Sequence, residues 1–416
     1  MRLGHWLGFA LPCLMVGAWS ATAEAAGPPT VSVPGFSIVS VTDQTNGAFR
    51  DIQYLVQNGS DPTSLFGVER ISLAPIPIGS FLPPIILEPP LGGSAAFYKR
   101  GNAPGGADFQ NSIAAVLATG GVDVYLISFR DSFLTPNECA SQGSCAFAAN
   151  WGFSAFVSDL TFIRALVAVD HTKQPAIGGA SLGGIVGFAA VNQNPTDYAG
   201  LALMDSALWT TDTTLRAGYE QLCLGTEAAI AAGQVVSVFE PLEAEFVELE
   251  LQNPNGPTPF PQFPAGTTNR QAYLLQLTTP SPGPPNSIFP PGAVGVAGSE
   301  PQNRLFFASE SRINAKGLTD NFYAANAIVR DFACSLGGDE TFVANLNQYT
   351  RPILALEDGK GLGSLADSTI ALTGSKDVDK IVYANFGHSD LTETPLHAAV
   401  LEAPTIAWLY GDVAKF

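Results

Sequence analysis

A serine flanked by glycines lies in the run Gly179-Ala180-Ser181-Leu182-Gly183, which fits the pattern G-x-S-x-G. A short apolar strand is predicted before it, at 175–178, and a helix after it, at 182–192. In this context the motif forms a tight strand-to-helix turn that leaves no room for side chains two positions from the serine. The turn exposes the hydroxyl at the start of a helix, where backbone N–H groups favour a developing oxyanion. We therefore expect Ser181 to be a nucleophile rather than a serine that only caps a helix.

A serine becomes an effective nucleophile only when a base removes its proton. His388 lies in the loop Asn385-Phe386-Gly387-His388-Ser389-Asp390, directly after an apolar strand. Loops that follow the strands of a parallel sheet share one edge with the nucleophile turn, so His388 is predicted to be the base. His171 precedes the strand that leads to Ser181 and therefore belongs to the opposite edge. His397 falls in the last predicted helix.

The elements that must position these residues alternate along the chain. Two or three antiparallel strands are predicted from Phe36 to Ile71, because apolar and polar residues alternate around turn signals. Short apolar runs separated by helical stretches then indicate a parallel sheet covered on both faces. The predicted strands are 83–87, 122–128, 175–178, 200–204, 352–356 and 380–384, and the helices are 112–119, 156–170, 182–192, 367–373 and 396–410.

The alternation is interrupted once. Residues 209–345 are predicted to form an inserted cap, with helices over 210–251, an irregular proline-rich lid edge over 253–301 and more helix between 303 and 336. The alternative for the proline-rich part is a flexible linker. The predicted organisation is a signal peptide at 1–26, a core formed by 27–208 and 346–416, and the cap between them.

The motif at Gly179–Gly183, the cap and the Gly-His-x-Asp segment at Gly387–Asp390 resemble the lipase/esterase branch of the α/β-hydrolase superfamily. The resemblance covers nearly all of the mature chain. It implies the α/β-hydrolase fold, with a mostly parallel central sheet flanked by helices. It also implies hydrolysis of carboxylic esters through an acyl-enzyme, by a nucleophile, an acid and a histidine in that chain order.

The acid of the triad is where the sequence departs from the resemblance. The superfamily usually has an aspartate a few residues past the strand that here ends at Leu356, but this position falls on or near a glycine in Glu357-Asp358-Gly359-Lys360-Gly361. Asp358 is preferred, because it closes the strand on the correct edge. Asp367 comes next, with helix capping as its alternative role. Asp205, which ends the strand before the cap, is the third candidate because some members use that loop.

The oxyanion hole of this superfamily consists of two backbone donors. The residue after the nucleophile, Leu182, is expected to supply the first. The second is expected from Leu91 or Gly92 in the turn Pro90-Leu91-Gly92-Gly93, although the histidine that usually precedes this glycine-rich turn is missing.

The start of the chain has the features of an export signal. A basic residue, Arg2, precedes an apolar run over 7–18 and a small-x-small cleavage pattern before Ala26. The run is too short for a membrane span, and no later stretch is long and apolar enough, so stable membrane insertion is not expected after the signal is removed. The predicted location is periplasmic or secreted.

Cysteine usage agrees with export. Four cysteines remain after removal of the signal, and we expect the pairs Cys139–Cys145 and Cys223–Cys334, the second of which would close the long insertion. The alternative is four unpaired buried thiols.

Net charge and composition limit the kinds of molecule that the chain is expected to bind. A formal net charge of −18 opposes nucleic-acid binding. No histidine pair has metal-ligand spacing and no phosphate-binding loop is present, so neither a metal nor another cofactor is expected. Aromatic residues in the cap favour a small-molecule or lipid-like ester with an apolar acyl group; they are Phe289, Phe306, Phe307 and Phe322. The alternatives are acyl transfer or peptide cleavage on the same triad, or a non-catalytic binding protein on this scaffold.

Overall fold

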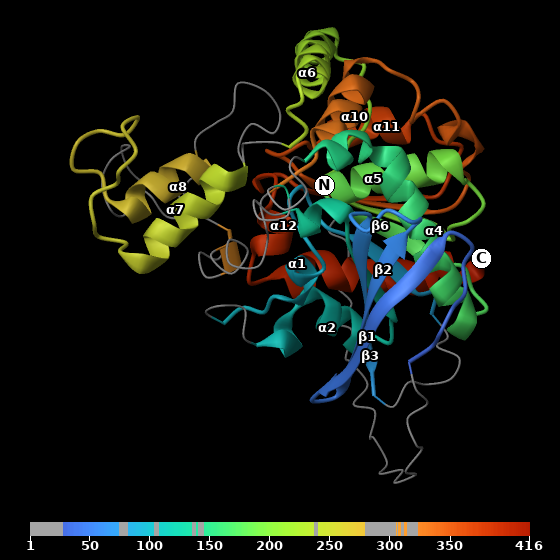
Figure 1. The fold of residues 1–416 in the computed structure, drawn as a ribbon. Coiled ribbons are helices and arrows are strands. Elements are labelled where there is room, and N and C mark those ends of the chain that lie inside the picture. Colours follow the sequence, from blue (N-terminus) through green and yellow to red (C-terminus); the bar gives the residue numbers. More distant parts are fainter. Residues whose placement is uncertain are drawn as a thin grey trace, which may run out of the picture.

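A nine-stranded sheet forms the centre of the computed structural model, with strand order β1-β2-β3-β5-β4-β6-β7-β8-β9 (Figure 1). The structure describes residues 28–74, 82–103, 108–134, 139, 145–236, 240–278, 305, 307, 308, 312, 313 and 323–416. The predicted signal peptide lies outside these residues, as do Phe289, Phe306 and Phe322 of the predicted cap. No helix in the described ranges is both long enough and apolar enough to cross a bilayer.

The first three strands form the predicted antiparallel start of the sheet, and β3 pairs antiparallel with β5. The remaining neighbours, from β5 through β4, β6, β7 and β8 to β9, are all parallel. The strands span β1 Phe36–Asn46, β2 Phe49–Asn58, β3 Leu65–Leu73, β4 Ile85–Glu88, β5 Val124–Ser128, β6 Ala176–Ala180, β7 Gly200–Met204, β8 Ile353–Asp358 and β9 Val378–Tyr383. The fold class predicted from the alternation of strands and helices is confirmed.

Helices cover both faces of the sheet. Helices α4 (Phe153–Asp170) and α5 (Leu182–Gln193) supply apolar side chains to one core cluster. Helices α1 (Ala96–Lys99), α2 (Ile113–Thr119) and α13 (Ala403–Gly411) supply the cluster on the opposite face. Because the central strands are buried on both sides, they appear in the sequence as continuous apolar runs rather than as alternating ones.

The last helical stretch is not continuous as predicted. Residues Ala398–Glu402 form a π-helical turn before α13 begins. Pro404 has no N–H to donate to the Val400 carbonyl, which lies four residues earlier. That carbonyl instead accepts a hydrogen bond of 2.6 Å from the Tyr383 hydroxyl at the end of β9.

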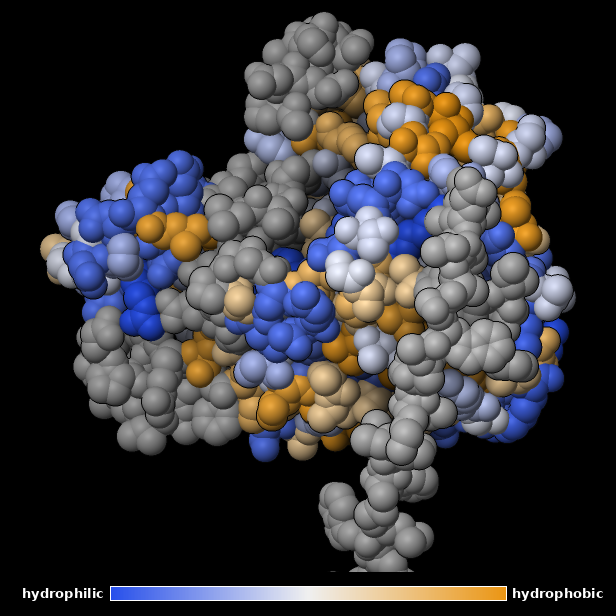
Figure 2. All heavy atoms as spheres, turned by 90° about the horizontal axis from the view of Figure 1, so that it is seen from below, coloured by the Kyte–Doolittle hydropathy of each residue, from blue (hydrophilic) through white to orange (hydrophobic). Residues whose placement is uncertain are grey.

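Strands β7 and β8 are neighbours in the sheet, although the chain between them contains the whole insertion. The described helices of the insertion are α6 (Thr213–Ala231), α7 (Glu240–Gln252), α8 (Asn269–Thr278) and α10 (Asn326–Gly337). Helix α6 packs against α10, whereas α7 and α8 pack on each other and project to one side of the sheet (Figure 1). The surface of this projection is mainly hydrophilic (left of Figure 2).

Helix α8 lies in the proline-rich part that was predicted to be irregular. Thr268 and Gln271 form a reciprocal capping box at its start, in which the Thr268 hydroxyl accepts from the Gln271 N–H and the Gln271 side chain accepts from the Thr268 N–H. The last proline before this helix is Pro264, so nothing in the sequence interrupts it. The prolines led to the prediction of irregular structure, although the residues of a helix capping box were present in the sequence.

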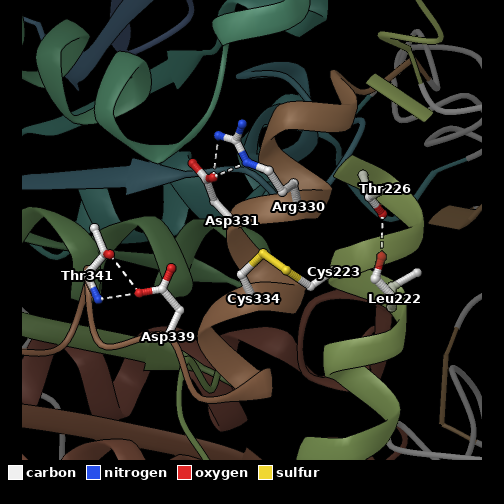
Figure 3. The surroundings of a disulfide bond; sticks show 8 residues. All are labelled: Leu222, Cys223, Thr226, Arg330, Asp331, Cys334, Asp339 and Thr341. Atoms are coloured by element: carbon white, nitrogen blue, oxygen red, sulfur yellow. Dashed lines mark hydrogen bonds and ion pairs between the residues drawn. A yellow bond between two sulfur atoms is a disulfide. The ribbon is translucent and has the colours of Figure 1, made fainter. Parts of the chain in front are cut away.

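Both predicted disulfides are present, Cys139–Cys145 and Cys223–Cys334. The second bond joins α6 to α10 (Figure 3), and it closes a loop that contains α7, α8 and all of the insertion between them. Among the described residues, Cys223, Glu227 and Cys334 lie close enough together to be metal ligands, but both sulfur atoms are used in the disulfide.

Candidate active site

Ser181 occupies the turn between β6 and α5 with φ 52° and ψ −116°, a conformation that is uncommon for a residue with a side chain. The glycines on either side make the turn possible. A Cβ atom at Gly179 would lie 2.1 Å from the Glu88 carbonyl oxygen, and one at Gly183 would lie 1.9 Å from the same atom. The end of β4 therefore presses directly against the turn, and only glycine fits at either position, as predicted from the motif.

His388 lies between Ser181 and a carboxylate. Its Nε2 atom is 2.8 Å from the Ser181 hydroxyl, and its Nδ1 atom is 2.6 Å from Oδ2 of Asp205. The side chain of His388 is 14% exposed, whereas that of Asp205 is 1% exposed. The Ser181–His388–Asp205 chain of hydrogen bonds has the geometry in which a buried carboxylate orients an imidazole and the imidazole activates a hydroxyl.

The Asp205 carboxylate is held by backbone donors from the last residue of β8 and the loop that follows it. Its Oδ1 atom accepts from the Gly363 and Asp358 N–H groups at 3.0 and 3.2 Å, and Oδ2 accepts from the Leu362 N–H at 2.9 Å. Asp205 itself has a positive φ of 49°. Three donors from different residues fix the orientation of this carboxylate.

Gly361 allows the loop after β8 to approach Asp205 and His388 closely. A Cβ atom there would lie 2.2 Å from Asp205 Oδ2 and 2.8 Å from the His388 Cα atom. A glycine therefore stands in this loop where the resemblance leads one to expect a carboxylate, and the carboxylate comes from the end of β7 instead. The glycine at the usual position was the signal that could have favoured Asp205 from sequence.

The two preferred acids lie elsewhere. Asp358 ends β8 and is fully buried, and its backbone N–H contacts Asp205. Burial raises the pKa of its carboxyl well above the usual range, and the nearby carboxylates of Asp205 and Asp390 act in the same direction. Asp367 is 52% exposed and forms an ion pair of 2.6 Å with Lys380 on β9. The structure brings neither side chain into a hydrogen bond with His388, because the loop after β8 folds back onto the end of β7.

The loop that contains His388 is fixed from within. The Asp390 carboxylate accepts from the Gly387 N–H at 2.7 Å, and burial raises the pKa of Asp390 to about 7. The other two described histidines lie away from Ser181. His171 bonds to Asp123 at the opposite edge of the sheet, and His397 is buried against Glu402.

The predicted oxyanion donors lie at the same edge as Ser181. Leu182 is the first residue of α5, so its N–H has no acceptor within its own helix. Strand β4 ends at Glu88, opposite Gly179 of β6, and the turn with Leu91 and Gly92 follows directly. The side chain of Leu182 is buried in the apolar core on one face of the sheet, and Leu91 packs against the same core.

No protein-family model matches the sequence, and no curated protein sequence does either. Among solved structures, a lipase candidate from Sulfolobus solfataricus superposes with a TM-score of 0.60 at 16% identity, over 89% of this chain and 99% of that one. A carboxylesterase structure from Nitrososphaera gargenis gives a TM-score of 0.46 at 13% identity, over 84% of this chain and 98% of that one. The first likeness and the sheet order agree with the predicted α/β-hydrolase fold.

Proposed function

We propose that this chain is a serine hydrolase that cleaves carboxylic esters through an acyl-enzyme. The observation that carries the proposal is the hydrogen-bonded chain Ser181–His388–Asp205 at the carboxyl ends of β6, β7 and β9. The α/β-hydrolase fold is compatible with this reaction. Because a fold alone does not determine chemistry, the proposal depends on these three side chains.

The reaction follows from the positions of these atoms. As the Ser181 oxygen forms a bond to the carbonyl carbon of the ester, its proton passes to Nε2 of His388. The Asp205 carboxylate balances the positive charge that develops on the imidazole. The bond to the alcohol oxygen then breaks, and the alcohol leaves with the proton held by His388. Water attacks the acyl-serine next and gives its proton to His388. The bond between the acyl carbon and the Ser181 oxygen then breaks, this oxygen takes the proton back from His388, and the carboxylic acid is released.

The negative charge on the carbonyl oxygen needs donors in the tetrahedral state. We assign the Leu182 N–H as one donor and the N–H of Leu91 or Gly92 as the other. Leu182 and Leu91 themselves have apolar side chains, which favours an apolar acyl group. We further propose that residues 209–345 act as a cap over this site.

We also propose that the protein is exported, from features that are separate from the catalytic residues. The described chain contains two disulfides, which persist in oxidising compartments. Residues 1–26 have the pattern of a cleaved signal peptide. We therefore place the mature chain in the periplasm or outside the cell, and sequencing the N-terminus of the exported protein tests the cleavage site.

The decisive experiment is hydrolysis of p-nitrophenyl esters from acetate to palmitate by the mature chain, beside Ser181→Ala. We expect the variant to lose at least about 10³-fold in kcat/KM and to lose labelling by a fluorophosphonate, because the nucleophile is absent. The preferred chain length measures the acyl pocket. Product formation with an added alcohol in place of water would indicate acyl transfer. A folded wild-type chain that cleaves no ester and takes no label would overturn the proposal in favour of a binding protein.

A further inference from the structure

A short segment of the insertion contacts two different cores. Leu305, Ala308 and Ile313 belong to the small apolar cluster of α7 and α8. Phe307 and Arg312, which lie between them in sequence, contact residues of the hydrolase core instead, the part of the chain before 209 and after 345. The segment therefore joins the projecting part of the insertion to the body of the protein.

Arg312 is the most deeply inserted of these residues, with 1% of its surface exposed. Its guanidinium donates to the Thr392 carbonyl oxygen at 2.8 Å, to Asn102 Oδ1 at 3.1 Å and to the Arg100 carbonyl oxygen at 3.2 Å. Its Nε atom lies 3.8 Å from Glu393 Oε2. A buried guanidinium with these partners is rigidly held, because each bond fixes the planar group in a different direction.

Glu393 links this cation to a second one. It is fully buried, and its Oε1 atom accepts from Arg100 at 3.0 Å. Arg100 in turn donates to the Arg312 carbonyl oxygen at 3.4 Å. One buried carboxylate is thus shared between two buried arginines, one from the hydrolase core and one from the insertion. The cost of removing these charges from water offsets much of their attraction, so such a group adds little net stability.

Two of the partners of Arg312 lie next to the loop that contains His388. Thr392 and Glu393 lie in α12 (Asp390–Glu393), which starts two residues after His388. On the other side of His388, the ring of Phe307 lies 4.5 Å from the ring of Phe386. The insertion therefore contacts the chain both before and after the catalytic histidine of the proposed reaction.

We propose that Arg312 is a positioning residue that fixes the His388 loop through Thr392 and Glu393, so that the insertion helps to hold the imidazole between Ser181 and Asp205. The inference rests on the proposed function for its kinetic consequence. Its structural consequence, the placement of His388 against Asp205, can be measured without any substrate.

The test compares Arg312→Met with Arg330→Met. Arg330 is a matched control, since it also belongs to the insertion but bonds to the adjacent Asp331 on α10 (Figure 3). With p-nitrophenyl acetate we expect Arg312→Met to lower kcat by about tenfold or more with KM nearly unchanged, because a small displacement of the base affects the transition state. Arg312→Lys keeps the charge but loses the planar fork, so it should give an intermediate value.

A proton spectrum supplies the readout that is independent of activity. The Nδ1 proton that His388 shares with Asp205 should give a far-downfield resonance, which can be assigned by its absence from His388→Gln. We expect this resonance to broaden or shift in Arg312→Met and to persist in Arg330→Met. If Arg312→Met matches Arg330→Met in both the kinetics and the spectrum, the inference is overturned.

Loss of folding is controlled by a second variant. Arg312→Gln removes the guanidinium fork but leaves the Arg100–Glu393 ion pair intact and keeps a polar group at this position, so it should fold where Arg312→Met does not. The same reduction in kcat and the same spectral change are expected of it, and unchanged values would contradict the inference. A wild-type chain that shows the resonance but cleaves no ester would refute the proposed function, and the spectra alone would then decide the role of Arg312.

Discussion

The ends of β7 and β8 lie side by side in the sheet. Asp205 directly follows β7, Asp358 is the last residue of β8, and both are buried, but the two carboxylates differ in their hydrogen-bond partners. Asp205 accepts from three backbone N–H groups and contacts His388. Neither side-chain oxygen of Asp358 has a hydrogen bond of normal geometry within the described chain, and the Leu391 N–H offers it only a weaker interaction. The two side chains are equally buried, but only the Asp205 carboxylate accepts several hydrogen bonds from the backbone.

The comparison shows that the position of a carboxylate in the sheet does not by itself determine its role. A carboxylate can balance the charge of an imidazolium only if it stays ionised, and donors rather than burial favour that state. Burial and the neighbouring charges of Asp205 and Asp390 raise the pKa of Asp358, which favours its neutral form. A place at the end of a strand on the correct edge is therefore not sufficient to identify the acid.

The largest effect is expected for Asp205→Asn. The amide no longer fixes the imidazole in the tautomer that accepts the serine proton, so kcat/KM for p-nitrophenyl acetate should fall by about 10³- to 10⁴-fold. Asp358→Asn and Asp367→Asn are the matched controls, and each should stay within about threefold of the wild type. If Asp358→Asn proves the more damaging variant, the roles of the two strand ends are reversed.

An intermediate effect is expected for Gly361→Ala, which tests the loop that supplies donors to Asp205. The added methyl group would meet Asp205 Oδ2 at 2.2 Å and the His388 Cα atom at 2.8 Å, so it must push the two residues apart. A displacement of about 1 Å costs on the order of 10²-fold in rate, and kcat should fall by that scale. Gly218→Ala on α6, where a Cβ atom meets nothing within 4 Å, should leave kcat unchanged. Wild-type kinetics for Gly361→Ala would show that this loop does not position the acid.

The α/β core was predicted well from sequence because its signals are local. Buried strands and the glycines around Ser181 follow from backbone sterics that act over a few residues. His388 followed from one further rule, that loops after parallel strands meet at one edge. The choice among Asp205, Asp358 and Asp367 could not be made this way, because it depends on which backbone N–H groups converge in space.

The insertion was harder to predict for a related reason. Its capping box at Thr268 was readable, but one of its contacts with the core is made by Arg312, a charged residue that sequence patterns place on the surface. Its partners Thr392 and Glu393 lie far along the chain. Long-range polar contacts of this kind leave no periodic signal in a single sequence.

The smallest effect on activity, and the sharpest test of the contrast between the strand ends, is expected for Asp358→Asn as a function of pH. A carboxyl with a higher pKa in the folded protein binds more protons when folded, so its contribution to stability falls as the pH rises above its ordinary pKa of 3.8. Asparagine has nearly the same shape and cannot ionise. The variant should therefore match the wild type in melting temperature near pH 4 and exceed it by a few degrees at pH 7, with the difference growing between these values. Asp367→Asn, at an exposed ion pair, should show no such growth. A variant that is less stable than the wild type at pH 7 would mean that Asp358 is ionised and bound by donors, and the distinction between the two carboxylates would then fail.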